Sequence, residues 1–175
     1  MSEHLLSEQL VSTSVDTPVG PMVAVVDEQD RVHVMGFGDI SGLLRRHPAG
    51  AQVRPAQEPG RVGEAMRAYI DGDLTALEDL VVSQPGGDFH QQAWDIMRTI
   101  PAGQTISYGE LARRLDSPEA SQAAGVACAS NAAAPVVPCH RVVGSDGSLH
   151  GYAYGLPVKQ WLLDHERGQY ADHLF

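Results

Sequence analysis

The sequence contains few cysteines. Its 175 residues include two, Cys128 and Cys139, which cannot form the disulfide framework of a small secreted domain. No set of cysteines and histidines has zinc-finger spacing, so no metal site is predicted. The first ten residues carry acids and no basic residue ahead of an apolar core, unlike a secretory signal. A reduced, cytoplasmic location is therefore expected.

Long apolar runs and positive charge are also scarce. No run approaches the roughly 20 apolar residues that span a bilayer, so no membrane partner is expected. The chain has 12 basic and 22 acidic residues and a net charge of −10, which excludes attraction to nucleic acid by bulk electrostatics. Residues 1–87 hold 6 basic and 13 acidic side chains, whereas residues 88–175 hold 6 and 9. A nucleic-acid surface would therefore belong to the second half and would need a local patch.

The first half has the pattern of an α/β domain with a small antiparallel sheet. Residues 22–26 are rich in β-branched side chains, and residues 31–37 alternate apolar and polar across a short polar turn. This pattern predicts two antiparallel strands. Apolar side chains at helical spacing predict a helix over residues 62–70. Residues 1–12 are expected to form a frayed tail or a short helix, and residues 48–59 are expected to form a loop.

The composition changes at residues 83–87, Ser-Gln-Pro-Gly-Gly. This stretch predicts a linker between an N-terminal α/β domain, 1–84, and a mostly helical C-terminal domain, 85–175. Within the second domain, apolar side chains recur at helical spacing over residues 89–100 and again over residues 158–166.

Two further helices are predicted between those segments. Ser107 and Glu110 have the spacing of a capping box, which would begin a short helix. Ser117 is expected to cap a third helix that runs through the alanine-rich stretch to Ala129. Two short helices joined by a tight turn predict a helix-turn-helix unit.

The segment Pro135–Val143 presents a thiol next to an imidazole. Pro135 and Pro138 fix the backbone and exclude a central strand or helix there. Cys139 followed by His140 is typical of an activated nucleophile. Because adjacent side chains diverge, His140 is expected to act through a water. The alternative is a buried structural cysteine.

Three other side chains have a functional and a structural interpretation. Glu166 could orient the imidazole as the third member of a relay, or it could be a solvated carboxylate at a helix end. Tyr108 could hydrogen-bond a heterocycle or donate a proton to a leaving group, or it could be a core tyrosine. Asn131 could lock the cysteine loop through hydrogen bonds to backbone groups, or it could be a plain turn residue.

A longer pattern surrounds these candidates. It reads Phe89-His90-x-x-Ala93-Trp94, Ile100-Pro101-x-Gly103-x-Thr105-x-Ser107-Tyr108-Gly109-Glu110-Leu111-Ala112, Asn131, Pro138-Cys139-His140-Arg141-Val142-Val143 and Gly155-Leu156-x-x-Lys159-x-x-Leu162-Leu163-x-x-Glu166. The pattern closely resembles the O6-alkylguanine-DNA alkyltransferases, also called methylated-DNA–protein-cysteine methyltransferases. The resemblance covers about residues 85–168 and is weaker at residues 17–21.

The resemblance implies a fold and a reaction. The fold would be a ribonuclease-H-like α/β domain followed by a helical domain with a helix-turn-helix. Members of the family bind the minor groove of double-stranded DNA, flip the alkylated guanine into a pocket and transfer its alkyl group irreversibly to a cysteine. The implied activity is a single-turnover S-methyltransferase for O6-alkylguanine, extending to O4-alkylthymine. It needs no cofactor and would act as a monomer.

The resemblance also assigns roles to matching positions. Cys139 would be the acceptor, with His140 as its base through a water and Glu166 completing the relay. Tyr108 would protonate or hydrogen-bond guanine N3, and Asn131 would brace the cysteine loop. The carbonyls of Cys139 and Val142 would accept from the guanine amino group, and the amide of Ala153 would face its oxygen. The implied substrate-binding set is Tyr108, Val142, Tyr152, Ala153, Tyr154 and Lys159, and the DNA-binding set is Ser107, Gln122 and Arg141.

The sequence departs from the family in the predicted recognition helix. Gln122 and Ala129 stand where the family carries arginines, and Tyr154-Gly155 replaces a Gly-Gly pair and places a bulky side chain at the pocket rim. These changes leave two alternatives: a module that binds alkyl lesions without transfer, or a self-alkylating protein with weak duplex affinity. A thiol hydrolase built on Cys139 and His140 is a further alternative.

Overall fold

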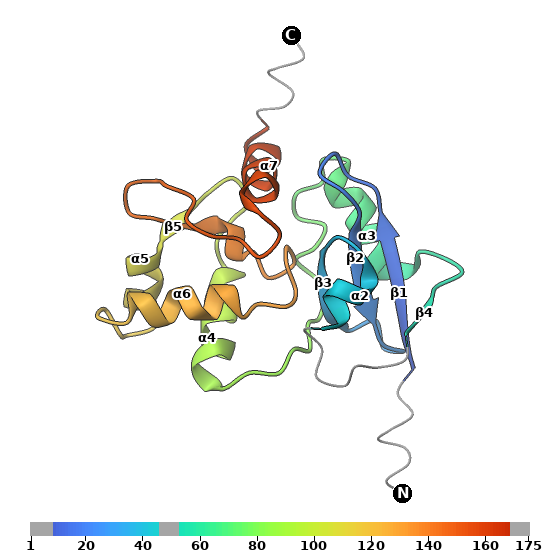
Figure 1. Cartoon of the computed structure of the whole chain (residues 1–175), viewed down its shortest axis with the longest axis horizontal. Helices are drawn as coiled ribbons and strands as arrows, with labels where there is room; N and C mark the ends of the chain where they lie inside the picture. Colours follow the sequence, from blue (N-terminus) through green and yellow to red (C-terminus); the bar gives the residue numbers. More distant parts are fainter. Residues whose placement is uncertain (1–8, 46–52, 169–175) are drawn as a thin grey trace, which may run out of the picture. The chain divides into compact units, whose positions relative to one another are not determined.

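The computed structural model describes residues 9–45 and 53–168, and Figure 1 shows the course of the chain. The chain divides into two compact units, Met1–Gln84 and Pro85–Phe175. None of the helices in the described ranges is long and apolar enough to cross a membrane.

The N-terminal unit is built on a four-stranded sheet in the order β3-β2-β1-β4. Its strands are β1 (Leu10–Val15), β2 (Met22–Val26), β3 (Val32–Phe37) and β4 (Val53–Pro55). β2 pairs antiparallel with β3, as the sequence predicts, and with β1.

The sheet is mixed rather than antiparallel, because β4 lies parallel to β1. Residues 10–12 are therefore strand and not a tail or helix, and residues 53–55 are strand and not loop. Neither segment has a strong local pattern of strand residues. Both are strands because their main chains pair with strands that are distant in the sequence. The rest of both predictions falls partly on residues 1–8 and 46–52, which lie outside the described residues.

Two helices complete this unit (Figure 1). α2 (Ile40–Leu44) contributes Leu43 to a buried cluster with Leu10, Val25 and Val34. α3 (Gly60–Ile70), the predicted helix, packs against β1 and β2. A Cβ atom at Gly63 would lie 2.8 Å from Thr13 Oγ1, so the absence of a side chain allows this close approach.

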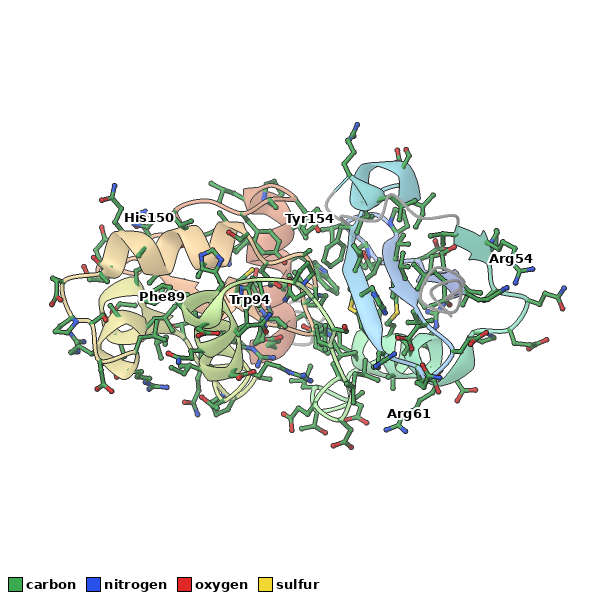
Figure 2. All side chains as sticks on the ribbon, turned by 90° about the horizontal axis from the view of Figure 1, so that it is seen from below. Arg54, Arg61, Phe89, Trp94, His150 and Tyr154 are labelled. Carbon is green, nitrogen blue, oxygen red and sulfur yellow. The ribbon has the colours of Figure 1, made fainter. Side chains whose placement is uncertain are left out.

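The C-terminal unit contains the following elements: α4 (Asp88–Met97), β5 (Ile106–Ser107), α5 (Tyr108–Arg114), α6 (Ser121–Ala129), the 3-10 turn η1 (Cys139–Arg141), β6 (Val142–Val143) and α7 (Leu156–Arg167). Trp94 comes from α4, like Phe89 (Figure 2). Its indole Nε1 donates to the carbonyl of Ala127 at 2.9 Å and so ties α4 to α6. The unit is mostly helical, as predicted.

The predicted helix caps are only partly realised. Ser107 caps α5, and its hydroxyl accepts from the Glu110 amide at 3.0 Å. The Glu110 carboxylate does not reach back to Ser107 and instead binds Arg113 and Arg114 at 2.8 and 3.0 Å. α6 begins at Ser121 rather than Ser117. Ser117 instead begins a turn closed by the Ala120 amide, and the residue before it, Asp116, has a positive φ of 56°.

Candidate active site

The acceptor segment lies between two short strands of the C-terminal unit. β6 pairs in parallel with β5, so that Ile106 lies opposite Val142 and Ser107 opposite Val143. This pairing joins the strand that leads into Tyr108 to the strand that follows the turn carrying Cys139. Residues 131–144 are all buried, and Cys139 is 7% exposed. The thiol is therefore held in a shielded turn rather than on a surface loop.

His140, Glu166 and Arg141 form a buried network next to the thiol. His140 Nε2 lies 2.9 Å from Glu166 Oε2. Arg141 donates from Nε to Oε1 and from Nη2 to Oε2 of the same carboxylate, both at 2.8 Å, and from Nη1 to the Ile100 carbonyl. The side chains of His140 and Glu166 are 0% and 1% exposed. The sequence-predicted pairing of His140 with Glu166 is present in this geometry.

The network fixes the tautomer of His140. Burial opposes ionisation of Glu166, but the His140 ring and the Arg141 guanidinium outweigh it, so the pKa of Glu166 lies well below its ordinary value. Burial lowers the pKa of His140, more than the neighbouring carboxylate raises it. An anionic carboxylate can only accept, so the neutral ring carries its proton on Nε2. Nδ1 is buried without a hydrogen bond to any residue that the structure describes, and its lone pair is available as a base.

Asn131 connects the end of α6 to the acceptor segment. Its Nδ2 donates to the Val137 carbonyl at 2.8 Å, and its Oδ1 accepts from the Ala133 amide at 3.0 Å. The residue is 2% exposed. The side chain thus binds two main-chain groups of the segment that leads to Cys139, as a brace would.

Tyr108 and Cys128 both lie within electrostatic reach of the acceptor thiol. Burial raises the pKa of Tyr108 to about 12, with smaller contributions from Cys128 and Cys139. The phenol therefore stays protonated at neutral pH and can donate. Its ring lies against Gly125 of α6, where an added Cβ would lie 3.9 Å from Cδ1, and it packs edge-on against the His150 ring at 5.5 Å.

Two residues expected at binding surfaces lie inside the unit. Arg141, expected to contact DNA, is 7% exposed, and Glu166 and Ile100 occupy its guanidinium. Lys159, expected to bind substrate, is 1% exposed. Its ammonium donates to the carbonyls of Val142, Leu149 and Gly151, which leaves no donor for a ligand. In this structure both cations are therefore buried and bonded within the C-terminal unit, and their roles toward DNA and substrate stay predictions.

The remaining predicted residues lie near the surface. Tyr152 and Tyr154 pack edge-on with ring centroids 5.6 Å apart, with the exposed Ala153 between them, in the loop before α7. His150 and Tyr154 are labelled in Figure 2. Gln122 is exposed on α6, and Ser107 is half-buried at the α5 cap.

Sequence reasoning missed the structural roles of Arg141 and Lys159 and the place of Cys128. One signal was available. Lys159 and Glu166 are seven residues apart on the predicted last helix, which puts both on its apolar face. Burial of both charged side chains was therefore detectable from the spacing. In the described part of the chain, no group of three or more His, Cys, Asp or Glu side chains is placed to hold a metal ion.

Comparison with known proteins shows the family. The family model described as "6-O-methylguanine DNA methyltransferase, DNA binding domain" matches residues 88–168. A methylated-DNA–protein-cysteine methyltransferase from Shigella flexneri is 38% identical over 164 residues, covering 90% of this chain and 96% of that protein. The chain belongs to the methylated-DNA–protein-cysteine methyltransferase family.

Other members resemble the chain over a similar extent. A methyltransferase of this family from Mycobacterium bovis is 35% identical and covers 89% of this chain and 92% of its own length. The crystal structure of Mycobacterium tuberculosis OGT in complex with DNA has 31% identity and a TM-score of 0.76, covering 91% of this chain and 94% of that chain. These similarities extend through both units of this methyltransferase-family chain.

Proposed function

We propose that this protein repairs DNA by transferring the alkyl group of O6-alkylguanine irreversibly to Cys139. The observation that carries the proposal is the buried set of Cys139, His140 and Glu166, in which the imidazole is held as a neutral base. Family membership supplies the activity, that of a methylated-DNA–protein-cysteine methyltransferase. O4-alkylthymine is a second substrate for the same chemistry.

The transfer begins with removal of the thiol proton. His140 Nδ1 takes this proton through a bridging water, while Glu166 and Arg141 keep the ring in the required tautomer. Cys139 Sγ then attacks the alkyl carbon, and the carbon–O6 bond breaks with its electron pair on the guanine. A strong, soft nucleophile is what displacement at an ether carbon requires.

The leaving base needs a proton donor and stabilisation of its oxygen. Tyr108, which stays protonated at neutral pH, donates its hydroxyl proton to guanine N3. Main-chain groups of Cys139, Val142 and Ala153 contact the amino group and the oxygen. The products are unalkylated guanine and an S-alkylcysteine. No cofactor is consumed, and each molecule reacts once.

The finer fold assignment follows the same family. We propose that α5 and α6 are the two helices of a helix-turn-helix and that α6 enters the minor groove, with Gln122 at the position of the flipped base. The N-terminal unit would be the ribonuclease-H-like domain. A monomer in the reduced cytoplasm is the form in which a single-use thiol stays available.

The decisive measurement is mass spectrometry of the protein after incubation with duplex DNA that contains O6-methylguanine. A mass increase of one methylene on the Cys139 peptide is expected, and Cys139→Ala should abolish it. Cys128→Ser is the matched control and should keep the adduct. A folded, reduced protein without an adduct would refute the proposal.

The alternatives are a lesion-binding module and a self-alkylating protein with weak duplex affinity. The uncharged outer face of α6 favours weak duplex binding. The similarity to a relative solved in complex with DNA favours repair, and the retained Cys139 speaks against a module that only binds. Parallel reactions with modified duplex and with free O6-benzylguanine separate them, because repair requires that duplex accelerate the transfer.

A further inference from the structure

His150, in the loop between β6 and α7, has a left-handed backbone conformation. Its φ is 61°, in the region that side chains other than glycine adopt least often. Histidine, asparagine and aspartate enter this region more readily than other side chains, but the conformation persists only where the surrounding structure holds it. The direction in which the exposed imidazole points is therefore set by the groups around it.

The main chain on both sides of His150 is held in place. The carbonyl of Leu149, which precedes it, and the carbonyl of Gly151, which follows it, both accept from the ammonium of Lys159. Earlier in the same loop, the Gly144 amide donates to the Ser148 carbonyl at 2.8 Å. These bonds fix the peptide groups next to His150 and leave its side chain to be placed by contacts of the ring.

The imidazole ring lies against Gly144. A Cβ atom added to Gly144 would lie 2.7 Å from Cδ2 of His150 and closer still to Nε2. Gly144 is not among the glycines with a positive φ, so its own backbone conformation does not require glycine. The missing side chain instead leaves the space that the imidazole fills.

The same imidazole contacts the ring of Tyr108. The two ring centroids are 5.5 Å apart and the planes meet at 72°, an edge-on arrangement that aromatic pairs favour. The Tyr108 ring also lies close to Gly125 of α6, where an added Cβ would be 3.9 Å from Cδ1. His150 therefore supplies a side chain that restrains the orientation of the phenol.

We propose that His150 is a positioning residue for alkyl transfer, whose ring holds the Tyr108 phenol in the orientation that delivers its proton to guanine N3. The proton moves from Tyr108 to N3 as the carbon–O6 bond breaks, and His150 neither gives nor takes a proton. The proposal rests on the proposed function, because Tyr108 has this task only if Cys139 is the alkyl acceptor. The orientation of the Tyr108 ring can nevertheless be measured without DNA.

The first test replaces His150 with asparagine, which tolerates the left-handed backbone but has no aromatic ring. Single-turnover transfer from O6-methylguanine duplex should slow by about 10-fold or more, as misplacement of a proton donor does. Alkylation of Cys139 by iodoacetamide should keep its rate, because iodide leaves without a proton. An unchanged transfer rate would overturn the proposal, and so would an equal loss in both reactions, which indicates general damage to the site.

Two further variants separate ring packing from other effects of His150. His150→Phe keeps an aromatic ring against Tyr108 and should keep most of the transfer rate. In a Tyr108→Phe background, His150→Asn should cause no further loss, because residues that act through one group are not additive. A His150→Phe protein as slow as His150→Asn, or full additivity with Tyr108→Phe, would contradict the assignment.

Gly144→Ala moves the imidazole without altering His150 itself. The added methyl group occupies the space of the ring, so transfer should slow as it does in His150→Asn, and the double variant should be no slower than either. Ser148 Oγ would also lie 2.7 Å from the new Cβ. Ser148→Ala is therefore the matched control and should keep the rate. A Gly144→Ala protein with the full transfer rate would count against a role for the ring position.

A measurement without DNA tests the contact directly. The chain has five tyrosines, and ¹³C labelling of their rings gives a signal for Tyr108 that disappears in Tyr108→Phe. That signal should shift in His150→Asn and stay in place in His90→Ala, which removes a half-buried imidazole from its contact with Trp94. Circular dichroism confirms that each variant is folded.

The two proposals fail in different ways. If the unaltered protein takes no methyl group from DNA while the Tyr108 signal shifts as expected, the repair function fails and the restraint of Tyr108 by His150 stands. If the methyl group is transferred but the Tyr108 signal is unchanged in folded His150→Asn, the repair function stands and the positioning role of His150 is refuted.

Discussion

Arg141 and Glu166 form a two-point ion pair, in which Nε and Nη2 each lie 2.8 Å from a different carboxylate oxygen. The pair is buried, and it shares the carboxylate with His140. Oε2 therefore contacts both the His140 ring and the guanidinium, whereas Oε1 is held by the guanidinium. The geometry makes Arg141 a structural support of the relay.

Removal of Arg141 should destabilise the protein strongly. Arg141→Met would leave a buried carboxylate without its cation, and the expected loss is about 3–5 kcal/mol of unfolding free energy. Urea denaturation provides the measurement. The control is Arg113→Met, which breaks an exposed pair with Glu110 and should cost at most about 1 kcal/mol. Equal losses in the two variants would contradict the assignment.

Glu166→Gln should separate catalysis from binding. An amide can present its NH₂ group to Nε2, so the ring is no longer forced to keep its proton there, and Nδ1 loses its role as base. Single-turnover transfer from O6-methylguanine duplex should slow by about 10²-fold or more. Duplex affinity, measured by fluorescence anisotropy, should be unchanged. A full-rate Glu166→Gln protein would remove the relay from the mechanism.

Loss of the Asn131 side chain should affect both stability and transfer. Asn131→Ala leaves the Ala133 amide buried without its partner, at about 1–3 kcal/mol, and leaves the Val137 carbonyl with the Cys139 amide as its donor, at 2.9 Å. The neighbouring Ser130 is exposed and bonds only within its own helix, so Ser130→Ala is the control and should change unfolding free energy by less than about 1 kcal/mol. The adduct assay on both variants reports whether the acceptor segment has moved.

The depressed pKa values of His140 and Glu166 should make stability fall in acid. The unfolded chain binds a proton at His140 below about pH 6.5, the ordinary pKa of histidine, whereas burial lowers the pKa in the folded chain, which binds the proton only at lower pH. Glu166 adds to the loss below about 4.5, as pH falls toward its depressed folded value. Each group contributes a slope of at most about 1.4 kcal/mol per pH unit.

Urea denaturation at pH 7, 6 and 5 tests this dependence. A His140→Gln variant should show a flatter slope over that interval than the unaltered chain. A steep acid slope that survives in His140→Gln would assign the titration to another group.

Duplex recognition should depend weakly on salt. α6 carries no basic side chain, so few counterions are released when it approaches DNA. Gln122→Arg should accelerate transfer from duplex and steepen the plot of log rate against log salt by about 0.9, the contribution of one phosphate contact. Free O6-benzylguanine should react with both proteins at the same rate, which controls for changes at the thiol.

The sequence predicted those helices and strands whose formation depends on the residue pattern within the element itself. The β2–β3 hairpin, α3, α4 and the Ser107 cap follow from alternation, helical spacing and side-chain capping. β1 and β4 were missed because their pairing is decided by partners distant in sequence. The start of α6 was misplaced because the turn after α5 places a left-handed Asp116 before Ser117, and that turn has no distinctive local signal.

The residues of the candidate site also differ in how far the sequence predicted their positions. Cys139, His140, Tyr108 and Asn131 were identified from residue chemistry and family resemblance. The sequence did not predict that Arg141 points inward, because its carboxylate partner is 25 positions away. An arginine in a family motif is equally compatible with a surface role.

The buried position of Lys159 has a practical consequence. Besides the terminal amino group, the chain has a single primary amine, and it is shielded in the folded state. Amine-reactive reagents can modify that side chain only when the C-terminal unit opens. The rate at which they do so under native conditions therefore measures how often this unit opens, at a position bonded to both Val142 and the 149–151 loop.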